Sequence, residues 1–272
     1  MLARLIILFA CSLFLFTVGV GTIHAANLGV NPVRVTLSES QKTGAITVLN
    51  KSTEPVSIQL EVLSWSQEEG KDVLTPTREI LATPPIFTIP AGASQLIRIG
   101  LRRVPEMQRE QTYRIILQEL PAPLSSEFNG TKMMMRISLP VFALPKLATK
   151  PVLLWKAIRT LDGGLKISLT NNGNAHIQIA NFSLSQPGSS QPWQIQKTSE
   201  YVLSGQSRDW ILPAILQNPA LAVGANIQIL AQTDAGQVEA EVMITPWYWA
   251  DVDHFLQSKY PNTTKYTSSS VN

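Results

Sequence analysis

The residue types that most often carry enzymatic chemistry are scarce in this chain. Its 272 residues include three histidines, His24, His176 and His254, and one cysteine, Cys11. A Ser-His-Asp arrangement therefore has few ways to form, and no G-x-S-x-G sequence is present. Paired carboxylates for glycoside hydrolysis stay formally open, but nothing indicates which two of the 19 acidic residues would converge. An enzyme is thus the weaker hypothesis, and we expect a protein without catalytic residues.

The same counts argue against a metal centre. A tetrahedral thiolate site needs two or more cysteines, and no pair of histidines has the spacing of metal ligands. His176 lies in a segment of alternating polarity, which is typical of a structural histidine in a strand. We expect no cofactor, no metal and no small-molecule substrate.

The most unusual segment is residues 132–143, K-M-M-M-R-I-S-L-P-V-F-A. Side chains of a strand alternate between its two faces, so four apolar side chains would share one face: Met133, Met135, Ile137 and Leu139. Methionine suits a surface that meets varied apolar partners, although an ordinary core strand with methionine as filler is the alternative. Pro140 has no N–H for a ladder, which favours a strand at a sheet edge.

An apolar strand at a sheet edge is an aggregation hazard, because it offers unpaired backbone groups to other chains. A protein that keeps one exposed usually has a partner for it. Addition of a strand from one chain to the sheet of another is a known recognition mode. The segment therefore points to binding of another protein.

The first 25 residues are typical of a secretory signal peptide. Arg4 supplies the positive charge, residues 5–20 are almost wholly apolar, and a cut after Ala25 follows a small residue. The apolar run is shorter than the ~20 residues of a membrane-spanning helix. An uncleaved anchor and a lipoprotein cut at Cys11 are the weaker alternatives. The mature chain would contain no cysteine, which fits an oxidising compartment.

Composition and periodicity predict an all-β protein. The chain is 44% apolar and 15% charged with a net charge of +3, which disfavours a disordered chain and a nucleic-acid binder. A first series of segments alternates in polarity: 33–37, 45–49, 56–62, 95–101 and 112–120. A second series follows: 165–169, 175–184, 227–231 and 238–244. Each series suits an immunoglobulin-like β-sandwich.

We predict four divisions of the chain on this basis. Residues 1–25 are the signal peptide, 26–145 the first sandwich, and 146–250 the second. Residues 251–272 form a short helix or a tail. The methionine-rich strand, at about 132–142, would be the last of the first sandwich.

Several stretches resemble the periplasmic chaperones of the chaperone–usher pathway, which assemble pili. The segment A-T-P-P-I-F-T-I-P-A-G-A-S-Q-L-I-R-I at 82–99 is similar to that family's A-T-P-P…P…R pattern. The segments 33–40, 109–121 and 171–177 resemble its first strand, a later strand and the opening hairpin of its second domain. The methionine-rich strand and its L-P-V-F ending resemble the archaic branch.

The resemblance implies two immunoglobulin-like domains at an angle, in the periplasm. It implies partners: pilin subunits, and an outer-membrane usher that receives them. In that family the strand named G1 fills the groove of an incomplete pilin sandwich, a mode called donor-strand complementation. Here the donor side chains would be Met133, Met135 and Ile137, with Leu139 adding to them.

The resemblance also implies a charged site in the cleft between the domains. The family binds the carboxylate of the pilin C-terminus with an arginine that corresponds to Arg34, and with a lysine whose position is Pro140 here. Arg136 is the nearest substitute on the strand, and Lys146 is another. The family's interdomain arginine corresponds to Leu144, and its partners would fall near Glu110 and Asp234.

A second hypothesis is a secreted adhesin or carbohydrate-binding module built from two sandwiches. It needs an aromatic binding surface, and Trp247-Tyr248-Trp249 is the one candidate in the sequence. Packing at a domain junction is the more ordinary role for such a cluster.

Overall fold

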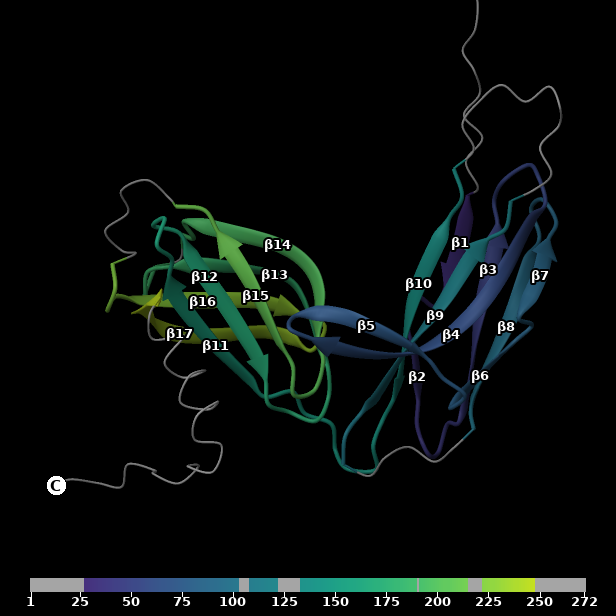
Figure 1. Ribbon diagram of the computed structural model, residues 1–272, viewed down its shortest axis with the longest axis horizontal. Helices are drawn as coiled ribbons and strands as arrows, with labels where there is room; N and C mark the ends of the chain where they lie inside the picture. The colour runs from purple at the N-terminus through teal and green to yellow at the C-terminus, as the bar shows by residue number, and fades with distance from the viewer. Residues whose placement is uncertain (1–26, 103–107, 122–132, 190, 215–221, 248–272) are drawn as a thin grey trace, which may run out of the picture.

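The computed structural model describes residues 27–102, 108–121, 133–189, 191–214 and 222–247. All seventeen regular elements within these ranges are β-strands, which confirms the predicted all-β class. They form two bodies, β1–β10 and β11–β17, joined by the chain that follows β10 (Figure 1). No helix in the described ranges is long and apolar enough to cross a membrane. The predicted signal peptide and the helix or tail at 251–272 lie outside those ranges.

The first body is a sandwich of two sheets. One sheet has the order β1 (Leu28–Asn31), β3 (Thr43–Asn50), β8 (Ser94–Leu101) and β6 (Ile80–Thr83). The other has the order β2 (Val35–Leu37), β10 (Arg136–Ala143), β9 (Gln111–Glu119), β4 (Val56–Glu68) and β5 (Lys71–Pro76), with β7 (Ile86–Ile89) also paired to β4. The chain thus passes from one sheet to the other between β1 and β2.

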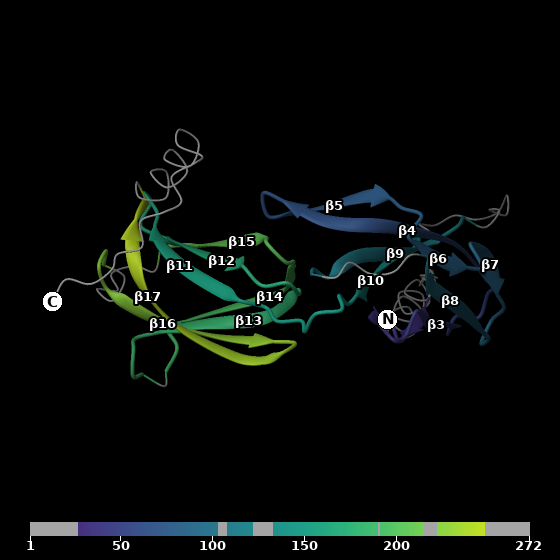
Figure 2. The same ribbon diagram turned by 90° about the horizontal axis from the view of Figure 1, so that it is seen from below.

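Alternating polarity builds the core of this body, as the sequence predicts. In β4, Val56, Ile58 and Leu60 are buried, whereas Gln59 between them is exposed. Buried apolar residues from both sheets form one cluster that includes Ile46, Ile97 and Ile115. Because β4 is 13 residues long, it continues past its neighbours and turns at Glu69-Gly70, both with positive φ, into β5. Figures 1 and 2 both show this hairpin extending toward the second body.

The second body is one continuous path of seven strands. Their order is β14 (Gln194–Val202), β13 (Ile177–Ser185), β16 (Asn226–Thr233), β17 (Gly236–Pro246), β11 (Leu153–Arg159), β12 (Leu165–Asn171) and β15 (Ser207–Leu212). Strand β17 links β14, β13 and β16 to β11, β12 and β15. Its first part pairs with β16, and its last three residues pair in parallel with β11. The enclosed core contains the packed rings of Trp155, Phe182 and Trp210.

Candidate functional site

Of the predicted strand at about 132–142, only the part from Arg136 onward is regular: it forms β10 (Arg136–Ala143), with the three methionines just before it, and β10 is only partly covered by neighbouring strands. Strand β10 pairs with β9 along its whole length, from Arg136 to Ala143. On its other side, β2 pairs only with Val141–Ala143. Residues 136–140 therefore have no strand on that side within the described part of the chain. Their outward backbone groups are positioned for pairing with a further strand.

The four apolar side chains proposed for this strand run from solvent into the core. Met133 is 63% exposed, and Met135 and Ile137 are half-buried. Leu139 is buried in the core of the first body, against which Ile137 also packs. Leu139 thus fixes the strand to its own domain, and the exposed apolar side chains lie before β10. The N–H of Met135 donates to Oε2 of the buried Glu119 at 2.9 Å, which orders the chain at this point.

Arg34 lies beside β10 at the level of Pro140. It immediately precedes β2, whose Val35 is opposite Val141 in the parallel register. Its side chain is 40% exposed, and Nη1 donates to Asp234 Oδ2 of the second body at 2.6 Å. A guanidinium has five N–H donors, so this contact does not exhaust Arg34.

Neither of the two substitutes proposed for the second cation joins Arg34. Arg136 is exposed and lies four residues before Pro140 on β10, which corresponds to about 13 Å along a strand. Lys146 pairs with Glu39 at 3.0 Å.

Arg114 is the cation that the structure does place at this level. It is the cross-strand partner of Pro140 on β9, so the two side chains share a face. Its guanidinium lies 3.6 Å from the ring centre of Trp65 and 5.4 Å from that of Tyr201. Burial lowers the pKa of Arg114, and the charges of Asp72 and Tyr201 oppose that effect. Sequence reasoning assigned Arg114 no role, because only the β9–β10 register reveals its position.

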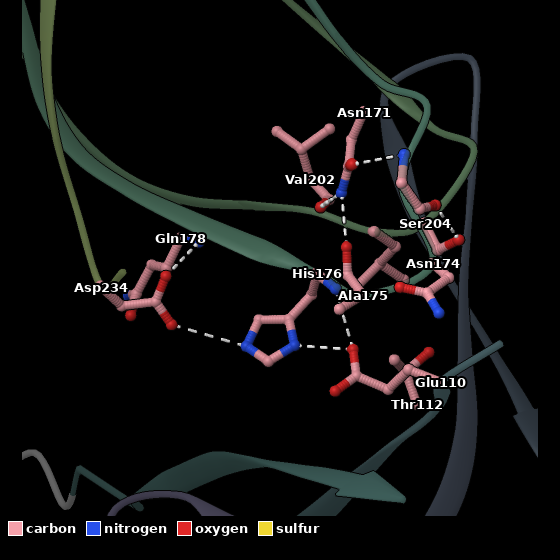
Figure 3. Close-up of polar contacts among 12 residues, drawn as sticks. Glu110, Thr112, Asn171, Asn174, Ala175, His176, Gln178, Val202, Ser204 and Asp234 are labelled. Carbon is pink, nitrogen blue, oxygen red and sulfur yellow. Dashed lines mark hydrogen bonds and ion pairs between the residues drawn. The ribbon is translucent and has the colours of Figure 1, made fainter. Parts of the chain in front are cut away.

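A polar network joins the two bodies at His176 (Figure 3). His176 immediately precedes β13, and Glu110 immediately precedes β9 of the first body. The ring nitrogen Nδ1 and the backbone N–H of His176 both contact Glu110 Oε2, at 2.7 and 2.9 Å. The other ring nitrogen, Nε2, lies 3.5 Å from Asp234 Oδ2, the atom that also accepts from Arg34. We call Glu110, His176, Asp234 and Arg34 the His176 network.

The turn before His176 fixes this geometry. Asn174 donates its side-chain amide to the carbonyl of Gln108 at 3.1 Å, and its own carbonyl accepts from the N–H of Glu110 at 3.0 Å. Its Oδ1 accepts from the N–H of Lys150, in the chain that joins the two bodies. The turn is therefore hydrogen-bonded both to the first body and to the chain that joins the two bodies.

The charges in the network shift two pKa values. Burial alone would lower the pKa of His176, but the hydrogen bonds and charges of Asp234 and Glu110 outweigh it, so that pKa is raised above its ordinary value. For Asp234, burial acts to raise the pKa, yet contacts with His176, the Gln178 N–H and Arg34 lower it to about 2. Both groups therefore favour their charged forms.

An apolar cluster beside the network completes the junction. It consists of Trp65, Phe142 and Leu203, with Tyr201 packed against them. The ring of Phe142 stacks on His176 with a centre-to-centre distance of 3.5 Å and an angle of 5° between planes. Phe142 belongs to β10, so the junction contacts the same strand that the three methionines precede.

The β4–β5 hairpin makes a second polar contact between the bodies. The side-chain amide of Gln67 donates to the carbonyl of Tyr201 at 2.9 Å and accepts from the N–H of Leu203 at 3.0 Å. Arg208 Nη1 donates to the carbonyl of Gly70, and its Nη2 lies 3.1 Å from Asp72. The extended hairpin thus holds its position against β14 and β15.

The structure brings both proposed interdomain residues, Glu110 and Asp234, to the junction. Leu144 supplies no charge there, and His176, whose pKa is raised, lies between the two carboxylates. Sequence reasoning treated His176 as an ordinary strand residue, whereas in the structure it lies just before β13 and contacts the first body. In the described ranges, no group of three or more His, Cys, Asp or Glu residues is arranged to hold a metal ion.

Comparison with known proteins identifies the architecture. Residues 27–148 match the family described as pili and flagellar-assembly chaperone, PapD N-terminal domain. The match places the first body in this family, and the chain as a whole resembles the PapD-like chaperones. The chaperone protein LpfB of Salmonella typhimurium strain LT2 is 26% identical over 177 residues, which cover 65% of this chain and 71% of LpfB.

Solved structures of PapD-like chaperones share the two-body fold. A chain from the complex of CsuC with the tip subunit CsuE, from archaic Csu pili of Acinetobacter baumannii, matches with a TM-score of 0.58 and 25% identity. That match covers 81% of this chain and 100% of the other. The E. coli chaperone DraB matches with a TM-score of 0.53 and 21% identity, over 80% of this chain and 99% of DraB. The predicted fold of two sandwiches is confirmed.

The match to this family also bears on the other two hypotheses. PapD-like proteins are assembly chaperones rather than enzymes, in agreement with the prediction from the sequence. The carbohydrate-binding alternative depended on three aromatic residues, of which only Trp247 is described, with 44% of its surface exposed. Tyr248 and Trp249 lie outside the described residues.

Proposed function

We propose that this PapD-like chaperone works in the periplasm, where it binds pilin subunits through β10 and the methionines before it, and delivers them to an outer-membrane usher. The observation that carries the proposal is the uncovered edge of residues 136–140 beside an apolar row that begins with exposed Met133. The relative CsuC, which was crystallised with a pilus tip subunit, supports the assignment. The expected signal peptide supports export.

Strand addition explains how such an edge recognises an incomplete sandwich. Main-chain hydrogen bonds along residues 136–140 would fix the register, and alternate side chains would fill apolar pockets of the pilin. Met133, Met135 and Ile137 are the side chains proposed to enter the groove, each contributing about 1.5–3 kcal/mol when fully buried. Ordering of both partners opposes this gain, so the sum is an upper bound.

The C-terminal carboxylate of the pilin is proposed to bind between Arg34 and Arg114. Arg34 keeps N–H donors beyond the one that contacts Asp234. Arg114 lies opposite Pro140, on the strand next to the position where the family has its lysine. Two guanidinium groups at one level of the sheet would form charge-assisted hydrogen bonds with one carboxylate.

A co-expression experiment tests the proposal. The chaperone, tagged at its C-terminus, is produced with candidate pilins from neighbouring reading frames and recovered from the periplasmic fraction. We expect a one-to-one complex that is lost in Met135→Asp, because a carboxylate in an apolar groove is strongly unfavourable. Met243→Asp is the matched control, since Met243 is 56% exposed on β17 of the second body.

Three outcomes would contradict the proposal. They are a chaperone that binds no pilin, a complex that survives Met135→Asp, and equal loss in Met243→Asp. If Met135→Asp instead prevents folding, as judged by circular dichroism, Met135 belongs to the core and the proposed register is wrong.

A further inference from the structure

His176 is placed between carboxylates of the two bodies. On one side, Nδ1 lies 2.7 Å from Oε2 of Glu110, in the first body. On the other, Nε2 lies 3.5 Å from Oδ2 of Asp234, in the second body. Figure 3 shows the ring in line between the two acids. A neutral imidazole carries a proton on only one nitrogen, so either neutral form would direct a lone pair at a carboxylate. Only the doubly protonated ring donates to both.

Glu110 depends on this proton. Its side chain is 1% exposed, and Oε1 has no hydrogen-bond partner among the described residues. Within the described part of the chain, Oε2 accepts only from the backbone N–H and the ring of His176. A buried carboxylate without a cation is costly, so loss of the imidazolium charge would leave Glu110 as an uncompensated charge at the domain junction.

We propose that His176 is a pH-sensitive latch between the two domains, closed when its ring is protonated and released when the ring loses its proton at alkaline pH. The cation holds Glu110 of the first domain against the second domain, and through Asp234 it supports the contact with Arg34. An arginine in this place would keep its charge at every physiological pH, whereas a histidine does not.

The other groups around the ring agree on balance with a closed latch. The aromatic face of Phe142, at 3.5 Å, favours a cation over it. The ring centre of Tyr201 is 5.7 Å away. Arg34 opposes protonation by its charge, but it reaches His176 only through Asp234, which is negative and accepts from it directly. The attraction of the protonated ring to two carboxylates in direct contact with it outweighs its repulsion from one cation at a greater distance.

The latch is tested by measuring the distance between the domains as a function of pH. Spin labels are attached to cysteines introduced at the exposed positions Thr53 and Lys197, one in each body, in a Cys11→Ser background. Double electron–electron resonance then gives the distribution of distances between the two labels at a series of values from about pH 6 to about pH 9. We expect one narrow distribution at the acid end and a broader or displaced one at the alkaline end. The wild-type ring, followed by its proton resonances, should titrate over the same interval.

Two variants separate the latch from general effects of pH. His176→Gln should have the broad distribution at every pH, whereas His254→Gln, the control, should keep the wild-type response. A distance distribution that is constant over the interval would overturn the proposal. So would a ring of His176 that titrates at or below the pH of an unperturbed histidine, a result that needs no variant. Because the measurement uses the chaperone alone, its outcome is independent of pilin binding.

Discussion

At the scale of single residues, pairing between neighbouring strands indicates which charged side chains lie together better than closeness along the sequence does. Arg136 is nearer to Pro140 in sequence than Arg114 is, yet the antiparallel register places Arg114 directly opposite Pro140. The same holds for Glu110, His176 and Asp234, which are far apart in the sequence but in contact at the junction. Sequence alone could suggest Glu110 and Asp234 only by resemblance to a family, and it could not indicate that a histidine lies between them.

Arg114 provides the test at this scale. Arg114→Met retains most of the apolar stem that packs on Trp65 but removes the charge, so the carboxylate of the pilin would lose one of its two cations. We expect pilin affinity to fall roughly tenfold or more, as for loss of a charge-assisted hydrogen bond. Arg136→Met is the matched control and should change affinity much less. Titration calorimetry with a purified pilin measures both, and equal losses would argue against the role of Arg114.

At the scale of elements, the strands followed from alternating polarity, but their connections between sheets did not. The segments 56–62 and 112–120 are strands because every second side chain is buried in one core. The extension of β4 beyond residue 62 was not predicted, since its burial pattern shifts where it leaves the first core and meets the second body. That extension produces the hairpin whose side chains fix the angle between the bodies.

Gln67 tests the contribution of the hairpin. Its amide pairs with the carbonyl of Tyr201 and the N–H of Leu203, and the residue is 2% exposed. In Gln67→Met, a side chain of similar volume leaves both backbone groups without their partner. We expect a loss of about 1–3 kcal/mol in the free energy of unfolding. Urea denaturation measures it against Gln59→Met, an exposed position on the same strand, where little change is expected. Equal effects in the two variants would show that the hairpin contact is not stabilising.

At the scale of the whole molecule, the His176 network predicts how stability depends on pH. Asp234 has its pKa lowered to about 2 from 3.8, so its contribution is present above about pH 3.8 and is lost as the pH falls toward 2. His176 has a raised pKa, so its contribution is complete below its ordinary value of 6.5 and is lost as the pH rises through the value in the folded protein. Between these limits both charges stabilise the junction.

A comparison of the stability of Asp234→Asn with that of wild type at decreasing pH tests the acid limit. Because Asp234 is partly exposed, solvent screening reduces its contribution, and we expect about 1 kcal/mol of lost stability near neutral pH. The difference from wild type should shrink as the pH falls below 3.8. Asp209→Asn, which breaks the surface pair with Lys166 inside the second body, is the control. A difference that persists to the acid limit would mean that the asparagine disturbs packing rather than charge.

Within the His176 network, the alkaline limit is set by the ring of His176. In His176→Gln the junction lacks the cation at every pH, so its free energy of unfolding should lie below that of wild type at pH 6 and approach it as the wild-type ring deprotonates. Denaturation in urea at a series of pH values measures the two curves. Convergence toward high pH assigns the difference to the charge between Glu110 and Asp234. Parallel curves would assign it to lost stacking on Phe142, which does not depend on protonation to the same degree. The shape of the difference, rather than its size, therefore decides between electrostatic and packing control of the domain junction.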